Sequence, residues 1–235
     1  MPSAKPTLEQ KRLDADIWII VAVTLAVLGV FFAVQNQMTG FVKDSNQPVL
    51  LRTLLAAAFQ FGIAGLGVTI VAAFRKESFL AYGLRAKGTL KSIALCVLCF
   101  VPYIVFAVAT GLAKSYLPLQ SVWTTRDVLA AGFPENTAGM LLIAAAWGFF
   151  EGFNYVAISG KINKRYPSKY KWLNWGAIVC AVLCILIHGM IGVTFAGVIE
   201  MITVLVIIYG MLMVKEFTGN AWGCVFIFVF LWNAF

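Results

Sequence analysis

The sequence predicts an all-α polytopic membrane protein with about seven transmembrane helices packed in one bundle. Of its 235 residues, 61% are hydrophobic and 12% are charged, whereas about 25% of the residues of a soluble domain are charged. Most hydrophobic residues lie in runs of roughly 17 to 26 residues, long enough for a helix to cross a bilayer. The basic residues, in addition, concentrate in alternate connections between these runs, as they do in membrane proteins.

The runs define the predicted elements in order. The segment 1–16 is polar and is interpreted as a cytoplasmic N-terminus. The first apolar run lacks a convincing cleavage site, so we predict a retained span and not a signal peptide. The seven predicted spans lie at about 17–34, 49–74, 90–113, 139–159, 173–190, 193–214 and 219–235. The longest connection, 114–138, carries few charges and is expected to cap the bundle as a partly ordered loop.

The distribution of charge predicts the topology. With the N-terminus in the cytoplasm, fourteen of the eighteen Lys and Arg residues lie on the cytoplasmic side, which the positive-inside rule favours. The four on the outer side are Lys43, Arg52, Lys114 and Arg126. In a soluble protein a net charge of +8 would suggest nucleic acid as a partner. In this chain we interpret it as loop charge that faces the lipid bilayer, and we expect no nucleic-acid partner.

A carboxylate in the fourth predicted span is the first candidate for function. Glu151 lies among apolar residues, where an ionisable side chain costs several kcal/mol unless it is paired or hydrated. At helical spacing it shares one face with Trp147, Asn154, Tyr155 and Ser159. The span therefore carries a polar stripe, and a structural hydrogen bond within the bundle is the alternative explanation for Glu151.

Three further polar residues lie at a similar predicted depth. These are His188, the single histidine of the chain, Glu200 and Asn233. Counted at the helical rise, they and Glu151 lie about 15 to 22 Å from the cytoplasmic ends of their spans. A carboxylate beside an imidazole in a cavity of low dielectric can orient and deprotonate a water molecule, as general-base hydrolysis requires.

Other roles remain open for these residues. His188, Cys184, Glu151 and Glu200 could in principle bind zinc, but the chain has no HExxH motif and no second histidine, so we expect no metal and no cofactor. Glu200 could relay protons or pair helices. Asn233 could simply join helices through hydrogen bonds.

The order of these residues resembles a known family. A glutamate in one span, a basic connection and a histidine in the next are followed by Tyr209-Gly-Met-Leu-Met, Phe217-Thr-Gly-Asn-Ala-Trp and Leu231-Trp-Asn233, and the segment 79–85 reads Phe-Leu-Ala-Tyr-Gly-Leu-Arg. This resembles the CAAX-protease and bacteriocin-processing (Abi) family of glutamate-type intramembrane endopeptidases, which are all-helical. The resemblance covers about 79–233. It implies a transmembrane core at 79–235, preceded by two N-terminal transmembrane helices at 17–78.

The family motifs are only partly kept. The first is Glu-Glu-x-x-x-Arg, which here corresponds to Glu151, Gly152 and Val156. In the family the first glutamate and the histidine of the second motif activate water. The resemblance assigns these roles to Glu151 and His188.

The second and third motifs are also incomplete. The second is Phe-x-x-x-His, with Cys184 at the phenylalanine position; the third is His-x-x-x-Asn, with Val229 at the histidine position. The family's third motif stabilises the oxyanion. The resemblance assigns that role to Asn233, while one of the two donors is lost.

The resemblance implies a divergent endopeptidase that cleaves a membrane-associated peptide or protein, in the cytoplasmic membrane of a prokaryote. Asn154, Tyr155 and Glu200 are expected to support the site or to bind substrate. The alternative is an inactive member that acts as a membrane scaffold or accessory subunit. A transporter or a proton pathway through Glu151, His188 and Glu200 is a third hypothesis.

Overall fold

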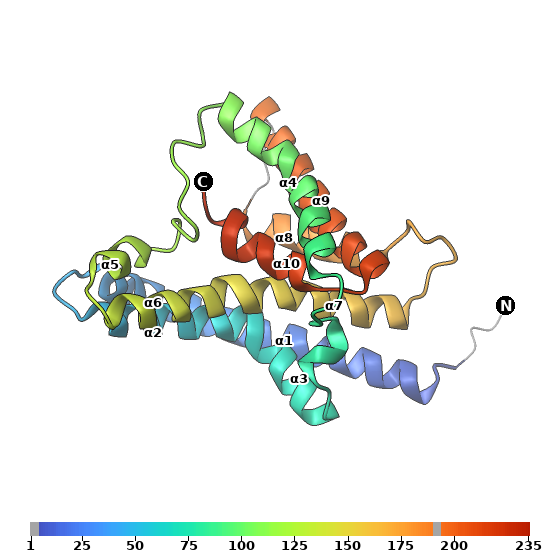
Figure 1. Ribbon diagram of the computed structural model, residues 1–235. Helices are drawn as coiled ribbons and strands as arrows, with labels where there is room; N and C mark the ends of the chain where they lie inside the picture. Colours follow the sequence, from blue (N-terminus) through green and yellow to red (C-terminus); the bar gives the residue numbers. More distant parts are fainter. Residues whose placement is uncertain (1–4, 190–193) are drawn as a thin grey trace.

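The computed structural model describes residues 5–189 and 194–235, and the regular structure within these ranges is entirely helical (Figure 1). Among the described residues, five helices are long and apolar enough to cross a membrane. In chain order they are α1 (Leu8–Lys43), α2 (Val49–Phe61) continued through the π-helical η1 (Gly62–Leu66) into α3 (Gly67–Arg75), α4 (Thr89–Ala109), α6 (Glu135–Ile143) continued through the π-helical η3 (Ala144–Phe150) into α7 (Glu151–Arg165), and α9 (Phe195–Thr218). The fold class predicted from the sequence is therefore confirmed as all-helical, with several apolar helices.

Two other predicted spans coincide with shorter apolar helices. They are α8 (Trp175–Ile187) and α10 (Trp222–Ile227) continued through the π-helical η4 (Phe228–Trp232). The 13 residues of α8 reach about 20 Å at the helical rise, less than the roughly 30 Å of a hydrocarbon core. Seven complete spans thus remain a prediction. The predicted boundaries at Met190 and Val193 lie outside the described residues.

The remaining elements are short. The 3-10 helix η2 (Phe79–Tyr82) lies before α4, and α5 (Thr125–Ala130) lies in the long connection before α6. This connection therefore contains one short helix.

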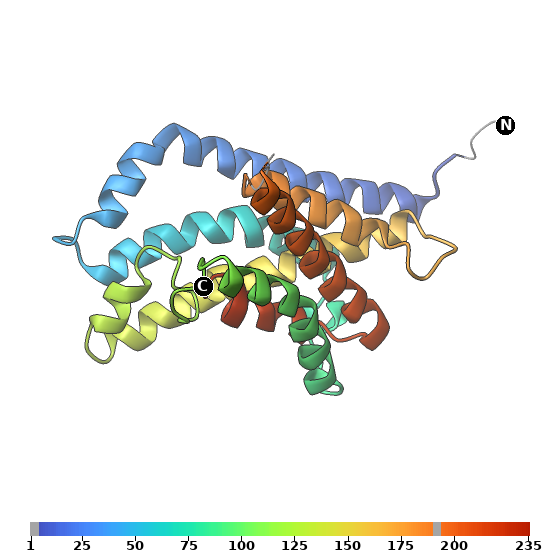
Figure 2. The same cartoon turned by 90° about the horizontal axis from the view of Figure 1, so that it is seen from above.

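The long helices form two groups (Figures 1 and 2). Helices α1, α2 and the continuous α6–α7 run lengthwise beside one another, and α1 packs against α2, α3 and α7. Helices α4 and α9 pack side by side and cross this layer at a steep angle. Helix α8 packs between α7 and α9, and α10 packs against α4 and α7. The main hydrophobic core lies where these groups meet.

Contacts between connections identify one end of the bundle. Arg12, before the apolar part of α1, forms an ion pair with Glu77 after α3 (3.2 Å), and Lys161 near the end of α7 reaches the same carboxylate (3.2 Å). The guanidinium of Arg85 donates to the carbonyl of Thr218 at the end of α9 (2.8 Å). The three segments rich in basic residues and the end of α9, which carries Lys215, therefore gather at the same end.

The opposite end joins the segments predicted to lie outside. Lys43 lies over the ring of Trp123, 4.9 Å from its centroid. Arg52 forms an ion pair with Asp127 at 2.5 Å. The segments that meet at each end of the bundle are therefore those that the charge distribution predicts to lie on the same side of the membrane.

Candidate functional site

Glu151 lies near the middle of the fourth long helix, at the first residue of α7. Its side chain is buried, with 8% of its surface exposed. The side-chain amide of Gln60, in the last turn of α2, donates a hydrogen bond to Oε2 at 2.8 Å. The other carboxylate oxygen, Oε1, lies 3.7 Å from Nε2 of His188. The structure therefore brings the predicted pair together.

The backbone of α8 determines which nitrogen of His188 faces Glu151. His188 caps the C-terminus of α8, and its Nδ1 lies 2.9 Å from the carbonyl oxygen of Cys184. A carbonyl only accepts hydrogen bonds, so Nδ1 carries a proton, and Nε2 is the nitrogen left to face Glu151. The ring also packs edge-on against Trp232, with the centroids 5.9 Å apart. The helix end thus directs Nε2 of His188 to Oε1 of Glu151.

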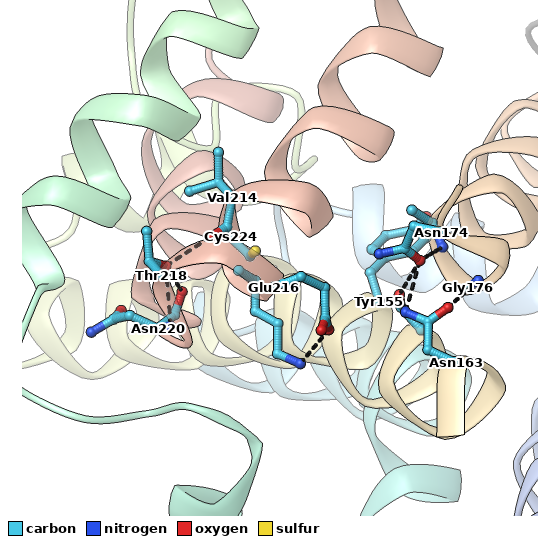
Figure 3. Close-up of polar contacts among 12 residues, drawn as sticks. Tyr155, Asn163, Asn174, Gly176, Val214, Glu216, Thr218, Asn220 and Cys224 are labelled. Carbon is cyan, nitrogen blue, oxygen red and sulfur yellow. Dashed lines mark hydrogen bonds and ion pairs between the residues drawn. The ribbon is translucent and has the colours of Figure 1, made fainter. Parts of the chain in front are cut away.

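Polar residues at the start of α8 fix this helix on α7 (Figure 3). The side chain of Asn174 caps α8 by accepting from the backbone of Ala177 at 2.7 Å, and it also accepts from Asn163 of α7 at 2.8 Å. Asn163 in turn accepts from the backbone of Gly176 at 2.8 Å. Because α7 and α8 run antiparallel from this joint, their other ends place Glu151 opposite His188.

Asn233 is held by the connection between α4 and α5. The hydroxyl of Ser121 donates to Oδ1 of Asn233 at 2.7 Å, and the backbone N–H of Ser121 donates to the Asn233 carbonyl at 3.3 Å. Nearby, Gln120 donates to the carbonyl of Ala234 at 3.0 Å. With its oxygen engaged by Ser121, the amide of Asn233 has its NH₂ group available as a donor.

Three cavities meet at His188. The central cavity, of about 350 Å³, lies between α1, α2, η3 and the connection at Ser121, and Gln60, Glu151, His188 and Asn233 line it. The lateral cavity, of about 330 Å³, lies between α1, α7 and α8 and shares Gln60, Glu151 and His188. The rear cavity, of about 140 Å³, lies against α4 and α9 and shares His188, Asn233 and Ser121. The polar residues therefore lie where a small molecule or a chain segment could reach them.

Three of these polar residues adjoin π-helical segments. Gln60 lies two residues before η1, Glu151 directly follows η3, and Asn233 directly follows η4. A π-helical turn holds an extra residue, changes the direction in which the next side chains project, and occurs often at functional sites. The irregular turns thus account for polar side chains from three helices converging in an apolar interior.

The other predicted site residues divide into two groups. Asn154 and Tyr155 line the lateral cavity beside Glu151, and the ring of Tyr155 stacks on Phe228 with the centroids 5.4 Å apart. Glu200 does not line any of the three cavities, and it lies one turn before Val204, which lines the rear cavity. The structure therefore does not join Glu200 to the pair.

The positions at which the family motifs are lost have packing roles. A β-carbon at Gly152 would lie 3.0 Å from the Cys224 carbonyl oxygen and 3.1 Å from Cα of Val225, so glycine allows α10 to approach α7 closely. Val156 is buried in the same core. Val229 lies against Gly148, where a β-carbon would be 3.2 Å from Cα of Val229. These residues fill space where the motifs would place polar side chains.

No group of three or more His, Cys, Asp or Glu side chains with a geometry suited to a metal ion occurs within 5–189 and 194–235. Cys184 is the closest candidate ligand to the pair, with its sulfur 3.7 Å from Nδ1 of His188. That nitrogen already donates to a carbonyl.

A second buried cluster, which sequence reasoning missed, lies at the basic end of the bundle. Asp16 of α1 is 1% exposed and pairs with Arg75 of α3 at 2.7 Å and with Lys161 of α7 at 2.9 Å. Lys161 also pairs with Glu77, which accepts from the Tyr82 hydroxyl at 2.5 Å. The sequence signal was weak because Asp16 stands at the edge of a polar segment.

The environment of this cluster shifts the pKa values of Glu77 and Tyr82. Burial opposes ionisation of Glu77, but the Tyr82 hydroxyl and Lys161 outweigh it and lower the pKa of Glu77. Burial, together with the Glu77 carboxylate, raises the pKa of Tyr82. Both groups therefore keep the protonation states that the hydrogen bond between them requires.

Comparisons of the chain with family models, with curated proteins and with solved structures gave no match. The functional argument therefore rests on the residues and on their geometry.

Gln60 and Ser121 also escaped sequence reasoning. Gln60 is an uncharged polar residue within a predicted span, which is a usable signal because polar side chains inside membranes commonly have partners. Ser121 lies in a connection, and nothing in its local sequence distinguishes it. Its contact with Asn233 depends on the fold.

Proposed function

We propose that the chain is an intramembrane endopeptidase of the CAAX-protease/Abi type in which Glu151 and His188 activate a water molecule. One observation carries the proposal: Oε1 of Glu151 and Nε2 of His188, whose Nδ1 is engaged by a carbonyl, face each other 3.7 Å apart at the junction of three cavities. In the proposed reactive state the carboxylate is ionised and the imidazole is neutral, so both are hydrogen-bond acceptors. Between them they favour a molecule that can donate two hydrogens, as water does.

The proposed reaction begins with that water. Its hydrogens point to Oε1 of Glu151 and Nε2 of His188, so its lone pairs point away toward a substrate carbonyl. The oxygen attacks the carbonyl carbon as Glu151 accepts a proton, and a tetrahedral intermediate forms. The C–N bond then breaks as the proton passes from Glu151 to the leaving amine nitrogen. The products are a carboxylic acid and an amine.

The amide of Asn233 is the proposed oxyanion donor. Because Ser121 donates to its oxygen at 2.7 Å, the amide NH₂ is oriented away from Ser121, and Asn233 lines the central cavity together with Glu151 and His188. One such donor contributes about 10²–10³ in rate. Since the family's histidine is replaced by Val229, we expect a slower enzyme than one with two donors.

The two larger cavities suggest the substrate. Aliphatic side chains of α1 and α8 line the lateral cavity, including Val21, Leu25, Leu28 and Leu183. The central cavity has a more polar border at Ser121 and Asn233. A peptide with an apolar portion, in or on the membrane, fits this division.

We propose seven spans with the N-terminus in the cytoplasm. The gathering of the basic segments at one end of the bundle supports this topology. Cysteine-accessibility labelling tests it, because a cysteine at Lys164 should react only with reagent in the cytoplasm and one at Asn136 only with reagent outside. Labelling from the opposite sides would reverse the topology.

Mapping of new N-termini tests the activity. Proteoliposomes containing wild type, Glu151→Gln or His188→Ala are incubated with membrane proteins of the expression host, and the new N-termini are identified by mass spectrometry. We expect termini that arise with wild type alone. Identical sets from all three, with folded protein in each, would contradict the proposal and favour a membrane scaffold or accessory subunit.

A further inference from the structure

Gln60 is the nearest hydrogen-bond donor to Glu151 among the contacts of the described residues. It comes from α2, outside the region 79–233 that carries the resemblance. Its Nε2 lies 2.8 Å from Oε2 of Glu151, and its side chain lines both the central and the lateral cavity. We infer that Gln60 is a positioning residue, which holds the Glu151 carboxylate so that Oε1 faces His188. This inference rests on the proposed function.

The division of the two carboxylate oxygens supports this role. A glutamate side chain can rotate about its last torsion, which is broad and roughly two-fold. The hydrogen bond from Gln60 selects one of these orientations by engaging Oε2. Oε1 then remains directed to Nε2 of His188. Without the Gln60 amide, the contacts described for Glu151 no longer select one orientation of its carboxylate about this torsion.

Aromatic packing places Gln60 at the same level along the bundle as Glu151. The neighbours of the two residues, Phe61 and Phe150, pack edge to face with their centroids 4.7 Å apart. Gly65 leaves room for this contact, since a β-carbon there would lie 2.8 Å from the Phe150 ring. The register between α2 and the fourth long helix is therefore set one residue away from the hydrogen bond. Gln60 meets Glu151 as a consequence of the packing.

Because Gln60 is uncharged, it can hold Glu151 in place without impairing its role as a general base. A lysine or arginine at this place would form an ion pair with Glu151 and would compete for the proton and for the orientation of the carboxylate. An amide satisfies one carboxyl oxygen without placing a positive charge beside it. It also cannot accept the proton that Glu151 takes from water. Gln60 thus orients the base without replacing it.

Infrared spectroscopy tests the contact without a substrate. The carboxyl bands of Glu151 are assigned from the difference between wild type and Glu151→Gln. The same difference is then measured in the background of Gln60→Met, which keeps the length of the side chain and removes the donor. We expect the Glu151 bands to shift in that background. Unshifted bands would overturn the inference.

Two other variants distinguish the loss of this hydrogen bond from a general disturbance of the helix. Gln60→Asn keeps the amide but is one methylene shorter, so it should also shift the bands while preserving polarity. Thr69→Val is the matched control, because it removes a hydroxyl that donates only within its own helix, to Gly65 at 2.9 Å. It should leave the Glu151 bands unchanged. If Thr69→Val shifts them equally, the effect is a general response of the helix and the inference fails.

Kinetics give the second readout. With the peptide that wild type cleaves most strongly in the mapping of N-termini, Gln60→Met should lower kcat by about 10²-fold, the cost of a misplaced catalytic group. KM should stay within about two-fold, since Gln60 orients the base and not the peptide. A change confined to KM would overturn the positioning role. If wild type cleaves nothing, the proposed function fails while shifted infrared bands still establish the contact.

Discussion

Two buried carboxylates, Glu151 and Asp16, have opposite surroundings in this molecule. Asp16 lies at the basic end of the bundle with two cations, Arg75 and Lys161, within 2.9 Å. Glu151 lies in the middle of the bundle with a neutral amide at 2.8 Å and an imidazole at 3.7 Å. Helix α7 carries one member of each cluster, Glu151 and Lys161. The same helix therefore supports a paired charge at one level and, at another, a carboxyl group that contacts an amide and an imidazole in place of Lys or Arg.

This contrast separates a structural role from a chemical one. The charges around Asp16 are matched and hydrogen-bonded, so they stay fixed and join α1, α3 and α7. Glu151 has a free oxygen, a neighbouring base and a cavity, which are the requirements for moving a proton. Such an arrangement costs stability, and the matched cluster at the end of the same helix provides a firm anchor for it.

Substitutions in the central pair should have the largest effect on activity. Glu151→Gln and His188→Ala should each lower peptide cleavage by about 10⁴-fold or more, and the double variant should be no worse than either, because two groups that activate one water act as a unit. Cleavage rates in proteoliposomes measure this. The amounts of folded protein should match those of wild type. Additive losses would show that the two residues act separately.

Substitution of Asp16 should affect stability most. Asp16→Asn leaves Lys161 and Arg75 without their shared carboxylate, and breaking a buried pair typically costs about 3–5 kcal/mol. Unfolding in mixed detergent micelles measures the loss, and the folded fraction should keep its cleavage rate. Asp14→Asn is the control: Asp14 pairs with Arg165 at 2.6 Å but is one-third exposed, so the loss should stay within about 1 kcal/mol. Equal losses would contradict the distinction between the clusters.

The sequence predicted the helices and the central pair for a physical reason. Ionisable residues in apolar runs are rare and conspicuous, so Glu151 and His188 stood out before their contact was known. Their distance could not be predicted, since it depends on how the asparagines at the start of α8 join α7. The predicted depth of Glu200 along its helix was not enough to place it in the site. Glu200 lies one turn before Val204 and does not line the rear cavity.

Tertiary contacts determine what the sequence did not reveal. Ser121 is distant from Asn233 in the chain, and its hydrogen bond requires the connection to fold over η4. Asp16 looked like part of a solvated N-terminal segment, but helix α1 begins at Leu8 and carries it into the interior. The π-helical turns before Glu151 and Asn233 likewise have no local signature in the sequence, although they aim both side chains.

Restoring the histidine of the family's third motif, by Val229→His, should have a moderate effect, and only on stability. Val229 packs against the backbone of η3 at Gly148 and does not line any of the three cavities. A histidine at this position is larger and meets that backbone, and overpacking of this kind costs about 1–3 kcal/mol. We expect Val229→His to lower the unfolding midpoint without raising the cleavage rate. A rate increase toward the 10²–10³ of one oxyanion donor would show that the imidazole reaches the site.

The pH dependence of the end cluster should give the smallest effect. Because its contacts lower the pKa of Glu77 in the folded protein, Glu77 contributes stability at neutral pH that is lost as the pH falls through this lowered pKa. The contribution should be up to about 1 kcal/mol, since Glu77 is partly exposed. Unfolding of wild type and Glu77→Gln between pH 7 and pH 3 should therefore differ most at neutral pH and converge in acid.

The Tyr82 hydroxyl provides the matched control for this titration. Tyr82→Phe removes a donor to Glu77 at 2.5 Å and keeps the ring against which Lys161 packs, 5.7 Å from its centroid. The pKa of Glu77 should then rise toward its ordinary value, so the acid-induced loss of stability should begin at higher pH than in wild type. An unchanged onset in Tyr82→Phe would assign the lowered pKa to Lys161 and Arg12 alone. The central pair should not respond to this change, because its partners lie at the other end of α7.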